Sequence, residues 1–236
     1  PVAVGINGAA LGGGYEIALA CHRRFALDDK SVKIGLPEAM LGLMPGAGGV
    51  VRMVRMLGMQ DALTLISQGK QLNATRALEQ GLVHELAGSE EEMAQKARAW
   101  LLSHPEARQP WEEPGYSLPG GTPDDAATQG LTYFGPVNVM NQTRGNMTAP
   151  QVIIAAVIDT ARVDYDTAHV VEARYFQRLL LDQVARNMMT TFFVQMNKLD
   201  AGASRPHGFD KTDVHKLGIL GDGVKGAGIA FAAARV

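Results

Sequence analysis

The sequence contains Ile6-Asn-Gly-Ala-Ala-Leu-Gly-Gly-Gly-Tyr-Glu16, a glycine-rich run that ends on a carboxylate. Glycine lets the backbone approach a ligand closely and adopt conformations that a Cβ atom forbids. The β-branched residues of 2–6 predict a short strand, and the residues after Gly12 predict a helix. Gly13 and Gly14 are therefore expected at a helix N-terminus, with Glu16 in the first turn.

A second glycine-rich stretch carries another acid: Gly35-Leu-Pro-Glu-Ala-Met-Leu-Gly-Leu-Met-Pro-Gly-Ala-Gly-Gly49 contains Glu38. Glu16 and Glu38 are too far apart in sequence to share one helix face, so only the fold could bring them together. One interpretation is plain: Glu16 stabilises a helix dipole and Glu38 is a loop carboxylate. The alternative is a site where backbone amides and two carboxyls meet one substrate.

The composition excludes several classes of protein. Of 236 residues, 46% are hydrophobic and 19% charged, as in ordinary globular proteins. A net charge of −2 provides no basic footprint for nucleic acid or for a membrane surface. No apolar run approaches the ~18 residues of a membrane span. With Cys21 as its one cysteine the chain cannot form an intrachain disulfide, which fits a reducing compartment. The six histidines lack metal-ligand spacing, so no metal site is predicted.

The ends of the sequence indicate a piece of a longer protein. Pro1-Val-Ala-Val-Gly-Ile6 predicts a buried strand with no initiator methionine and no lead-in. Arg235 and Val236 lie inside an apolar helical run. We therefore expect sequence on both sides.

Hydrophobic periodicity predicts alternating strands and helices in the first hundred residues. Ile17, Ala20, Cys21 and Phe25 recur at helical spacing, and a strand is expected over 32–36, stopped by Pro37. Further helices are expected over 50–57, 60–67, 74–80 and 90–103, with a strand over 82–86.

The middle of the chain has a different character. Residues 105–149 are expected to be an irregular excursion, and residues 150–213 a helical connector and linker. One helix is predicted over 151–161. A second, capped by Asp166 or Thr167, is predicted to run roughly 50 Å towards Leu199. Its apolar stripe would consist of Val170, Ala173, Leu180, Val184 and Met188.

The last segment is Leu217-Gly-Ile-Leu-Gly-Asp-Gly-Val-Lys-Gly-Ala-Gly-Ile-Ala230, with a G-x-G-x-x-G motif at Gly221, Gly223 and Gly226. A strand over 214–220 before the motif and a helix over 226–236 after it match the start of a dinucleotide-binding Rossmann domain, whose helix N-terminus holds a pyrophosphate. The alternative is a glycine-rich turn that packs a strand on a helix. The acidic residue expected about 20 positions later falls beyond the sequence.

The residues around the two acids favour different chemical roles. The Gly13 amide is placed to supply half of an oxyanion hole for an enolate that develops on a thioester. The helix dipole favours the ionised form of Glu16, which suits a general base. Glu38 follows Pro37 in apolar surroundings, where burial would raise its pKa and suit it to donate a proton.

Residues 6–21 and 34–49 strongly resemble the enoyl-CoA hydratase (crotonase) family. Gln68-Gly-Lys70 and Ala74-Thr-Arg-Ala-Leu-Glu-Gln-Gly-Leu-Val83 continue the match, which covers roughly residues 1–87. The resemblance implies an α/β crotonase-like fold, of which this chain would hold the C-terminal part of the ββα spiral.

The resemblance also implies roles for three residues. Glu16 and Glu38 match the catalytic pair that holds the water added to trans-2-enoyl-CoA. Glu16 would orient and activate the water, and Glu38 would exchange a proton with the α-carbon. Gly13 matches one oxyanion amide, whereas the other, with most of the surface that binds coenzyme A, lies upstream in the family.

The order of segments resembles the α subunit of the multifunctional fatty-acid β-oxidation complex, where a 3-hydroxyacyl-CoA dehydrogenase domain follows the hydratase. This implies a partial crotonase domain over 1–104, the excursion over 105–149, the connector over 150–213 and a truncated NAD-binding Rossmann domain over 214–236. It also implies an acyl-CoA substrate, NAD as cofactor, a thiolase β subunit as partner and the bacterial cytoplasm as location.

Asp222 and Lys225 depart from that resemblance, since the family has small or apolar residues there and an acid beside a pyrophosphate disfavours NAD binding. Two other functions remain open. One is a non-catalytic scaffold for the thiolase partner. The other is Δ3-Δ2 enoyl-CoA isomerisation, which needs an acid but no captured water.

Overall fold

The computed structural model describes residues 1–206, 208–209, 212, 214–221 and 223–235. The chain separates into two compact units, Pro1–Asn197 and Lys198–Val236, which are described one at a time. The domain boundaries expected at residues 104, 149 and 213 stay predictions.

The first unit is built on two small sheets. In one, β1 (Ala3–Ile6), β3 (Arg23–Leu27) and β6 (Glu85–Ala87) run parallel in that order. In the other, β2 (Ala9–Leu11) pairs in parallel with β4 (Lys33–Gly35), which pairs antiparallel with β5 (Gln71–Leu72). The strands predicted over 2–6 and 32–36 are confirmed, and the one predicted over 82–86 lies slightly later, at β6.

The helices around the sheets are α1 (Gly13–Ala20), the 3-10 turn η1 (Pro37–Leu41), α2 (Gly49–Leu57), α3 (Met59–Ser67), α4 (Ala74–Glu79) and α5 (Glu90–Ser103). The five α-helices were predicted within two residues and η1 was not predicted, while the helical stripe assigned to α1 is wrong. Phe25 lies in β3, and Ile17 is 70% exposed. The helix ends because Cys21 is extended, and the next residues pair with β1, so sheet pairing overrides the local periodicity.

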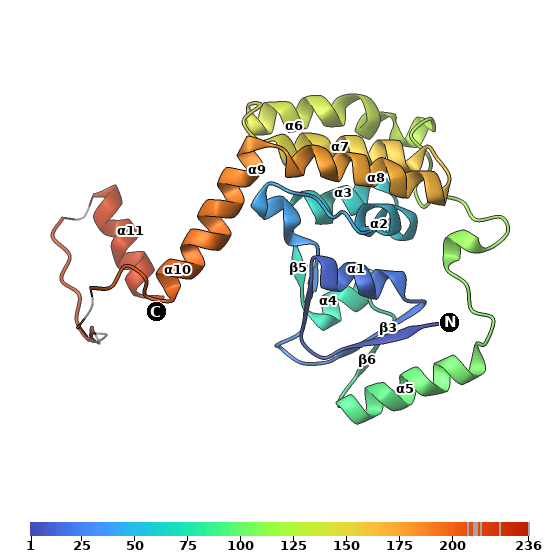
Figure 1. The fold of residues 1–236 in the computed structure, drawn as a ribbon, viewed down its shortest axis with the longest axis horizontal. Coiled ribbons are helices and arrows are strands. Elements are labelled where there is room, and N and C mark those ends of the chain that lie inside the picture. The colour runs from blue at the N-terminus through green and yellow to red at the C-terminus, as the bar shows by residue number, and fades with distance from the viewer. Residues whose placement is uncertain (207, 210–211, 213, 222, 236) are drawn as a thin grey trace. The chain divides into compact units, whose positions relative to one another are not determined.

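A helical layer covers α2 and α3. It contains α7 (Thr148–Ala161), which packs on α2, α3 and α8 (Tyr165–Leu180), and α6 (Gly135–Thr143), which packs on α7 (Figure 1). The helix predicted over 151–161 is therefore confirmed as α7. Residues 130–143 are helical where an irregular stretch was expected. Packing on α7 explains the difference: α6 approaches α7 so closely that a Cβ built on Gly135 would lie 2.6 Å from the Cδ1 atom at the end of the Ile154 side chain.

The single long helix predicted after residue 166 is wrong. Asp164, not Asp166 or Thr167, caps α8 by accepting the N–H of Thr167 at 2.9 Å. The helix breaks after Leu180, and the chain continues as α9 (Gln183–Met188), the π-helical η5 (Met189–Gln195) and α10 (Met196–Asp200).

The predicted apolar stripe of α8 is also wrong. Val170 is 50% exposed and Leu180 42% exposed. The buried side chains are Ala168, Glu172 and Leu179, because α7 and α2 cover that side of the helix. A periodicity analysis places an acid such as Glu172 outside the core, and so it selected the wrong face of α8 as the buried one.

The second unit contains α11 (Val224–Ala233), close to the predicted helix. The strand predicted over 214–220 is wrong, because these residues have no regular structure. A strand is stabilised by ladder hydrogen bonds to a neighbour, and the described residues of this unit contain no other strand. Within the described residues, the predicted Rossmann start therefore lacks its first element.

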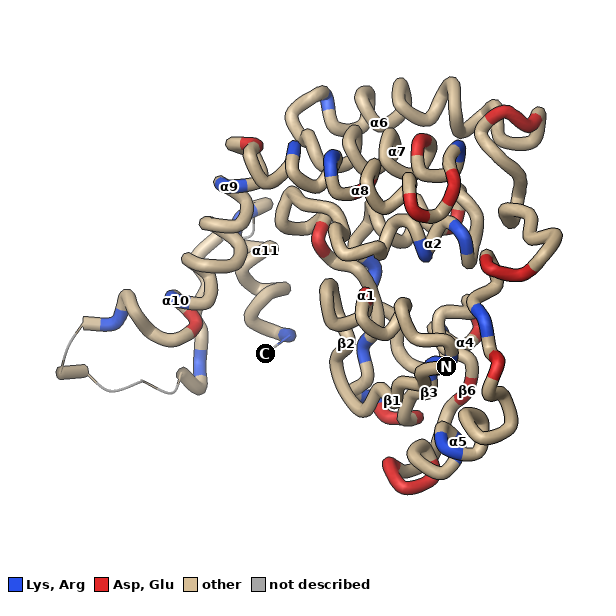
Figure 2. Tube along the Cα trace, turned by 45° about the vertical axis from the view of Figure 1, so that its right-hand side comes forward, with Lys and Arg blue, Asp and Glu red and all other residues tan. Residues whose placement is uncertain are grey.

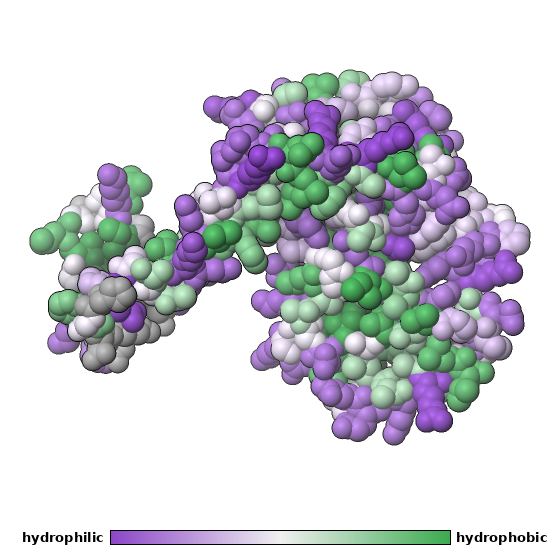
Figure 3. Space-filling model, viewed as in Figure 1, coloured by the Kyte–Doolittle hydropathy of each residue, from purple (hydrophilic) through white to green (hydrophobic). Residues whose placement is uncertain are grey.

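Charge and hydropathy are mixed over the first unit. Figure 2 shows basic and acidic residues interspersed, with the acidic first turn of α5, Glu90 to Glu92, at one end. Figure 3 shows hydrophobic residues gathered over α1 and the neighbouring strands. In the described part of the chain, no helix has the length and apolar character needed to cross a membrane.

Candidate active site

The strand order brings the two predicted acids to one edge of a sheet. β2 and β4 are parallel neighbours with Leu11 opposite Gly35. α1 follows β2 directly, and η1 begins two residues after β4. The carboxyl ends of parallel strands lie at the same edge, so Glu16 of α1 and Glu38 of η1 emerge side by side.

The N-terminus of α1 presents free backbone donors. Gly12, the N-cap, has φ 57° and ψ −131° and anchors the turn by donating its N–H to the Gly35 carbonyl at 3.0 Å. No described side chain caps the helix. The N–H groups of Gly13 and Gly14 therefore lack acceptors among the described residues, and a Cβ on either glycine would meet open space.

Glu38 is half-buried beside this turn. Its Oε2 atom is buried and has no hydrogen-bond partner among the described residues. Burial raises the pKa of Glu38 to about 7, and the nearby Glu16 carboxylate contributes to the rise. A Cβ on Gly12 would lie 2.7 Å from Glu38 Oε1. Residue 12 must therefore be glycine for this carboxyl to occupy its position, a constraint that the sequence analysis missed.

Glu16 is 4% exposed and bound on one side only. Its Oε1 atom accepts the N–H groups of Ala47 at 2.7 Å and Gly49 at 2.8 Å. No described group donates a hydrogen bond to Oε2. The glycine-rich segment before α2 thus orients the carboxylate and leaves one oxygen available.

A third acid, Glu172 of α8, holds the same segment and was not predicted from the sequence. It is 1% exposed, and its two oxygens accept the N–H groups of Gly48 at 2.6 Å and Val51 at 2.9 Å. Burial raises the pKa of Glu172 to about 7, whereas its two N–H donors favour the ionised form. Glu16 and Glu172 therefore bind interleaved amides of residues 47–51.

A sequence signal for Glu172 did exist. Ala168, Glu172 and Leu179 have helical spacing, so this acid shares one helix face with small and apolar residues. Buried carboxylates are rare unless they are paired or hydrogen-bonded. Its partners, more than 120 residues upstream, are backbone amides, which sequence does not distinguish.

The second glycine motif lies in the other unit. Gly221 has φ 96°, and a Cβ on Gly226 would lie 2.0 Å from the Gly221 carbonyl oxygen, so both positions require glycine. Gly223 is the N-cap of α11. Among the described residues, no side chain caps this helix and nothing lies within 4 Å of a Cβ built on Gly223. Lys225 is exposed, and Asp222 lies outside the described residues.

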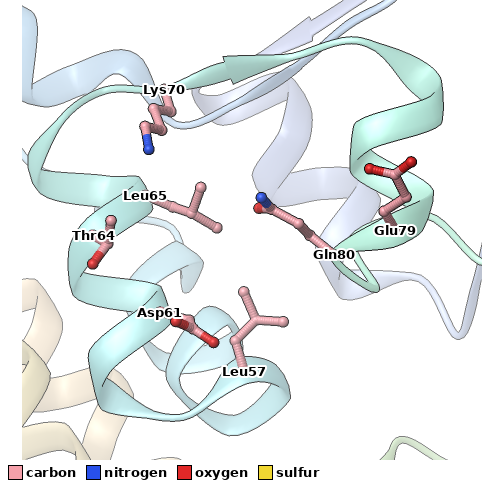
Figure 4. A pocket seen from close by; sticks show the side chains of 7 residues that line it. All are labelled: Leu57, Asp61, Thr64, Leu65, Lys70, Glu79 and Gln80. Carbon is pink, nitrogen blue, oxygen red and sulfur yellow. The ribbon is translucent and has the colours of Figure 1, made fainter.

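A separate pocket of about 360 Å³ opens between α3 and α4 (Figure 4). Asp61, Lys70 and Glu79 line it, and all three are exposed. Neither Glu16 nor Glu38 lines this pocket, so it is separate from the candidate site.

Comparison with known proteins agrees with this arrangement. Residues 1–107 match the family described as enoyl-CoA hydratase/isomerase. The fold is similar to a putative enoyl-CoA hydratase from Streptomyces avermitilis, with a TM-score of 0.52 and 18% identity over 90% of this chain and 57% of that one. It is also similar to carnitinyl-CoA hydratase from Mycobacterium avium, with a TM-score of 0.50 and 27% identity over 80% of this chain and 58% of that one.

Residues 1–107 are thus similar to the enoyl-CoA hydratase/isomerase family, and the similar structures support an α/β crotonase-like fold. The chain spans less than two thirds of the length of both similar structures.

Proposed function

We propose that the protein containing this chain adds water to trans-2-enoyl-CoA in fatty-acid metabolism, with Glu16 and Glu38 as its acid pair. One observation carries the proposal. Glu38 has a pKa of about 7, and its buried Oε2 atom has no hydrogen-bond partner among the described residues. It lies at the same sheet edge as Glu16, whose Oε2 accepts no hydrogen bond from a described group. A protonated acid, an acceptor for water and free amides are the groups that hydration of a thioester-conjugated double bond requires.

The proposed reaction follows from these positions. Glu16 Oε2 accepts a hydrogen bond from water and takes its proton as the water oxygen bonds to the β-carbon. The π electrons move to the thioester oxygen, where the Gly13 N–H stabilises the enolate. Glu38 then gives its proton to the α-carbon, which completes an L-3-hydroxyacyl-CoA. Proton exchange with solvent restores both acids.

The elements that carry the pair also carry exposed apolar side chains. Ile17 follows Glu16 in α1 and is 70% exposed, and Met40 of η1 is 59% exposed. Exposed apolar side chains on the elements that carry both acids provide area for an apolar substrate. Isomerisation needs one acid only, and a scaffold needs neither, so the pair at one edge favours hydration.

We propose as a second step that the protein oxidises this hydroxyl with NAD, as part of a complex with a thiolase. The support is the loop at Gly221 and Gly226, whose geometry only glycine permits, and the N-terminus of α11, which no described side chain caps. The amides after Gly223 would hold the pyrophosphate. NAD, when bound, accepts a hydride from the carbon that carries the hydroxyl.

The test measures enoyl-CoA hydration in the protein that contains this chain. We expect Glu16→Gln and Glu38→Gln each to lower kcat by at least the ~100-fold typical of a lost acid–base group. Glu106→Gln, at an exposed glutamate outside the site, is the matched control. Near-normal rates in either site variant, with the fold retained, would refute the proposal, and turnover of a 3-enoyl-CoA alone would indicate the isomerase.

A further inference from the structure

A cavity of about 210 Å³ lies apart from the two acids. Arg24 of β3, Arg55 of α2, His84 and Gln109 contribute to its lining, and neither Glu16 nor Glu38 does. A water molecule takes about 30 Å³ in the liquid, so the cavity exceeds the volume of one water several-fold.

Arg24 is a buried cation that pairs with no acid among the described residues. It is 2% exposed, and it donates from Nε to the Leu82 carbonyl at 2.9 Å and from Nη1 to the Cys21 carbonyl at 3.0 Å. For Nη2 the acceptor is the weak thioether of Met56 at 3.7 Å. Among the described residues, no carboxylate forms a salt bridge with Arg24 or Arg55. Burial lowers the pKa of Arg24, as expected for a guanidinium with no counter-charge.

His84 adds a second donor that faces Arg24. The backbone N–H of Arg24 donates to His84 Nδ1 at 3.0 Å, so Nδ1 is an acceptor. The proton of the neutral ring is therefore on Nε2. Nε2 lies 3.3 Å from Arg24 Nη2, which also carries only donors. Two hydrogen-bond donors thus face each other, with no described acceptor between them. Burial and the charge of Arg24 lower the pKa of His84 to about 4, which keeps the ring neutral.

Arg55 contributes a second buried guanidinium, 6% exposed. Its Nη2 donates to the Val163 carbonyl at 3.0 Å, and its guanidinium lies 5.4 Å from the Tyr165 ring. The acids nearby have other partners. Asp164, which is close enough to raise the pKa of Arg55, caps α8, and Glu112 accepts the N–H of Gln109 at 2.9 Å.

We propose that this cavity binds a small oxyanion of the phosphate class, whose oxygens accept the facing donors of Arg24 and His84. Guanidinium groups match the geometry of phosphate and bind it through charge-assisted hydrogen bonds. The site is independent of the hydration chemistry, since it uses no residue of the acid pair.

The test uses the whole chain and inorganic phosphate, with sodium chloride added to keep ionic strength constant. We expect the Tm to rise with phosphate and not with chloride alone, because a ligand that binds only the folded state stabilises it. In protein labelled with ¹⁵N-histidine, the Nε2–H resonance of His84 should shift with the same phosphate dependence. Coenzyme A is a further arm: a shift with free phosphate identifies the bound ion, and a shift with coenzyme A only would overturn this assignment.

Two variants sharpen the result. His84→Asp supplies a carboxylate to Arg24, so we expect a higher Tm without phosphate and loss of the phosphate-dependent shift. Arg98→Gln, at an exposed arginine, should keep the wild-type response. No saturable shift of the Tm or of the His84 resonance, or an unchanged response in His84→Asp, would overturn the proposal. Should His84→Asp fail to fold, the wild-type resonance still decides.

Discussion

Replacing Glu172 tests how the candidate site is held together. Its carboxylate is 1% exposed and binds the N–H groups of Gly48 and Val51. Glu172→Ala leaves both amides buried without an acceptor, and each such loss costs about 1–3 kcal/mol, so we expect ~2–6 kcal/mol of destabilisation. Glu172→Gln keeps one acceptor oxygen and should cost roughly half as much.

The assay is denaturant unfolding followed by tryptophan fluorescence. Trp111 stacks on Tyr165 of α8 at 5.5 Å, so its emission reports on the helix that carries Glu172. Gln177→Ala, at an exposed position of the same helix, is the control and should lie within ~0.5 kcal/mol of wild type.

The variants also have an expected effect on the site. Glu16 Oε1 is held by Ala47 and Gly49, which alternate with the amides that Glu172 binds. Loosening this segment should therefore lower the hydration kcat more than it changes KM, and Glu172→Gln should recover part of the loss. A Glu172→Ala protein as stable as the control would show that this carboxylate does not hold the segment, and the reasoning would fail.

Three further outcomes are expected. Gly12→Ala puts a Cβ 2.7 Å from Glu38 Oε1 at φ 57°, so denaturant unfolding should show a loss of ~1–3 kcal/mol, whereas Gly14→Ala, facing open space in α1, should be neutral or stabilising. Because Glu38 has its pKa raised from 4.5 to about 7, the folded state keeps a proton that the unfolded state has lost. Unfolding free energy measured against pH should therefore fall as pH rises between those values, less steeply in Glu38→Gln. Asp164→Ala removes the cap of α8 and should cost about 1 kcal/mol in the same unfolding assay; no change would contradict the capping role.

Two errors in the sequence analysis, at Phe25 and at residues 214–220, share one cause. Phe25 fits a helical period, yet it lies in β3 because β1 is available to pair with it. Residues 214–220 have strand-like composition, yet no neighbouring strand among the described residues of their unit stabilises them. In both cases, whether a partner strand distant in sequence was available decided the structure, and the segment's own secondary-structure preference did not.

Local pattern was sufficient for features that neighbouring residues create. The turn before α1 and the glycine segment before α2 follow from residues within a few positions, so Glu16 could be placed in the first turn of α1 from the sequence. Glu38 was expected in a loop after Pro37, and the 3-10 turn η1 that carries it was not predicted. The burial that raises the pKa of Glu38 was also expected from its apolar neighbours.

Glu16 and Glu38 lie close together only because β2 pairs in parallel with β4. Glu172 binds the backbone amides of residues 48 and 51 only because α8 packs against that segment. The facing donors of Arg24 and His84 likewise come from segments 60 residues apart. Periodicity and turn chemistry act over a few residues, whereas burial and hydrogen bonding of a side chain depend on elements that meet only when the chain folds.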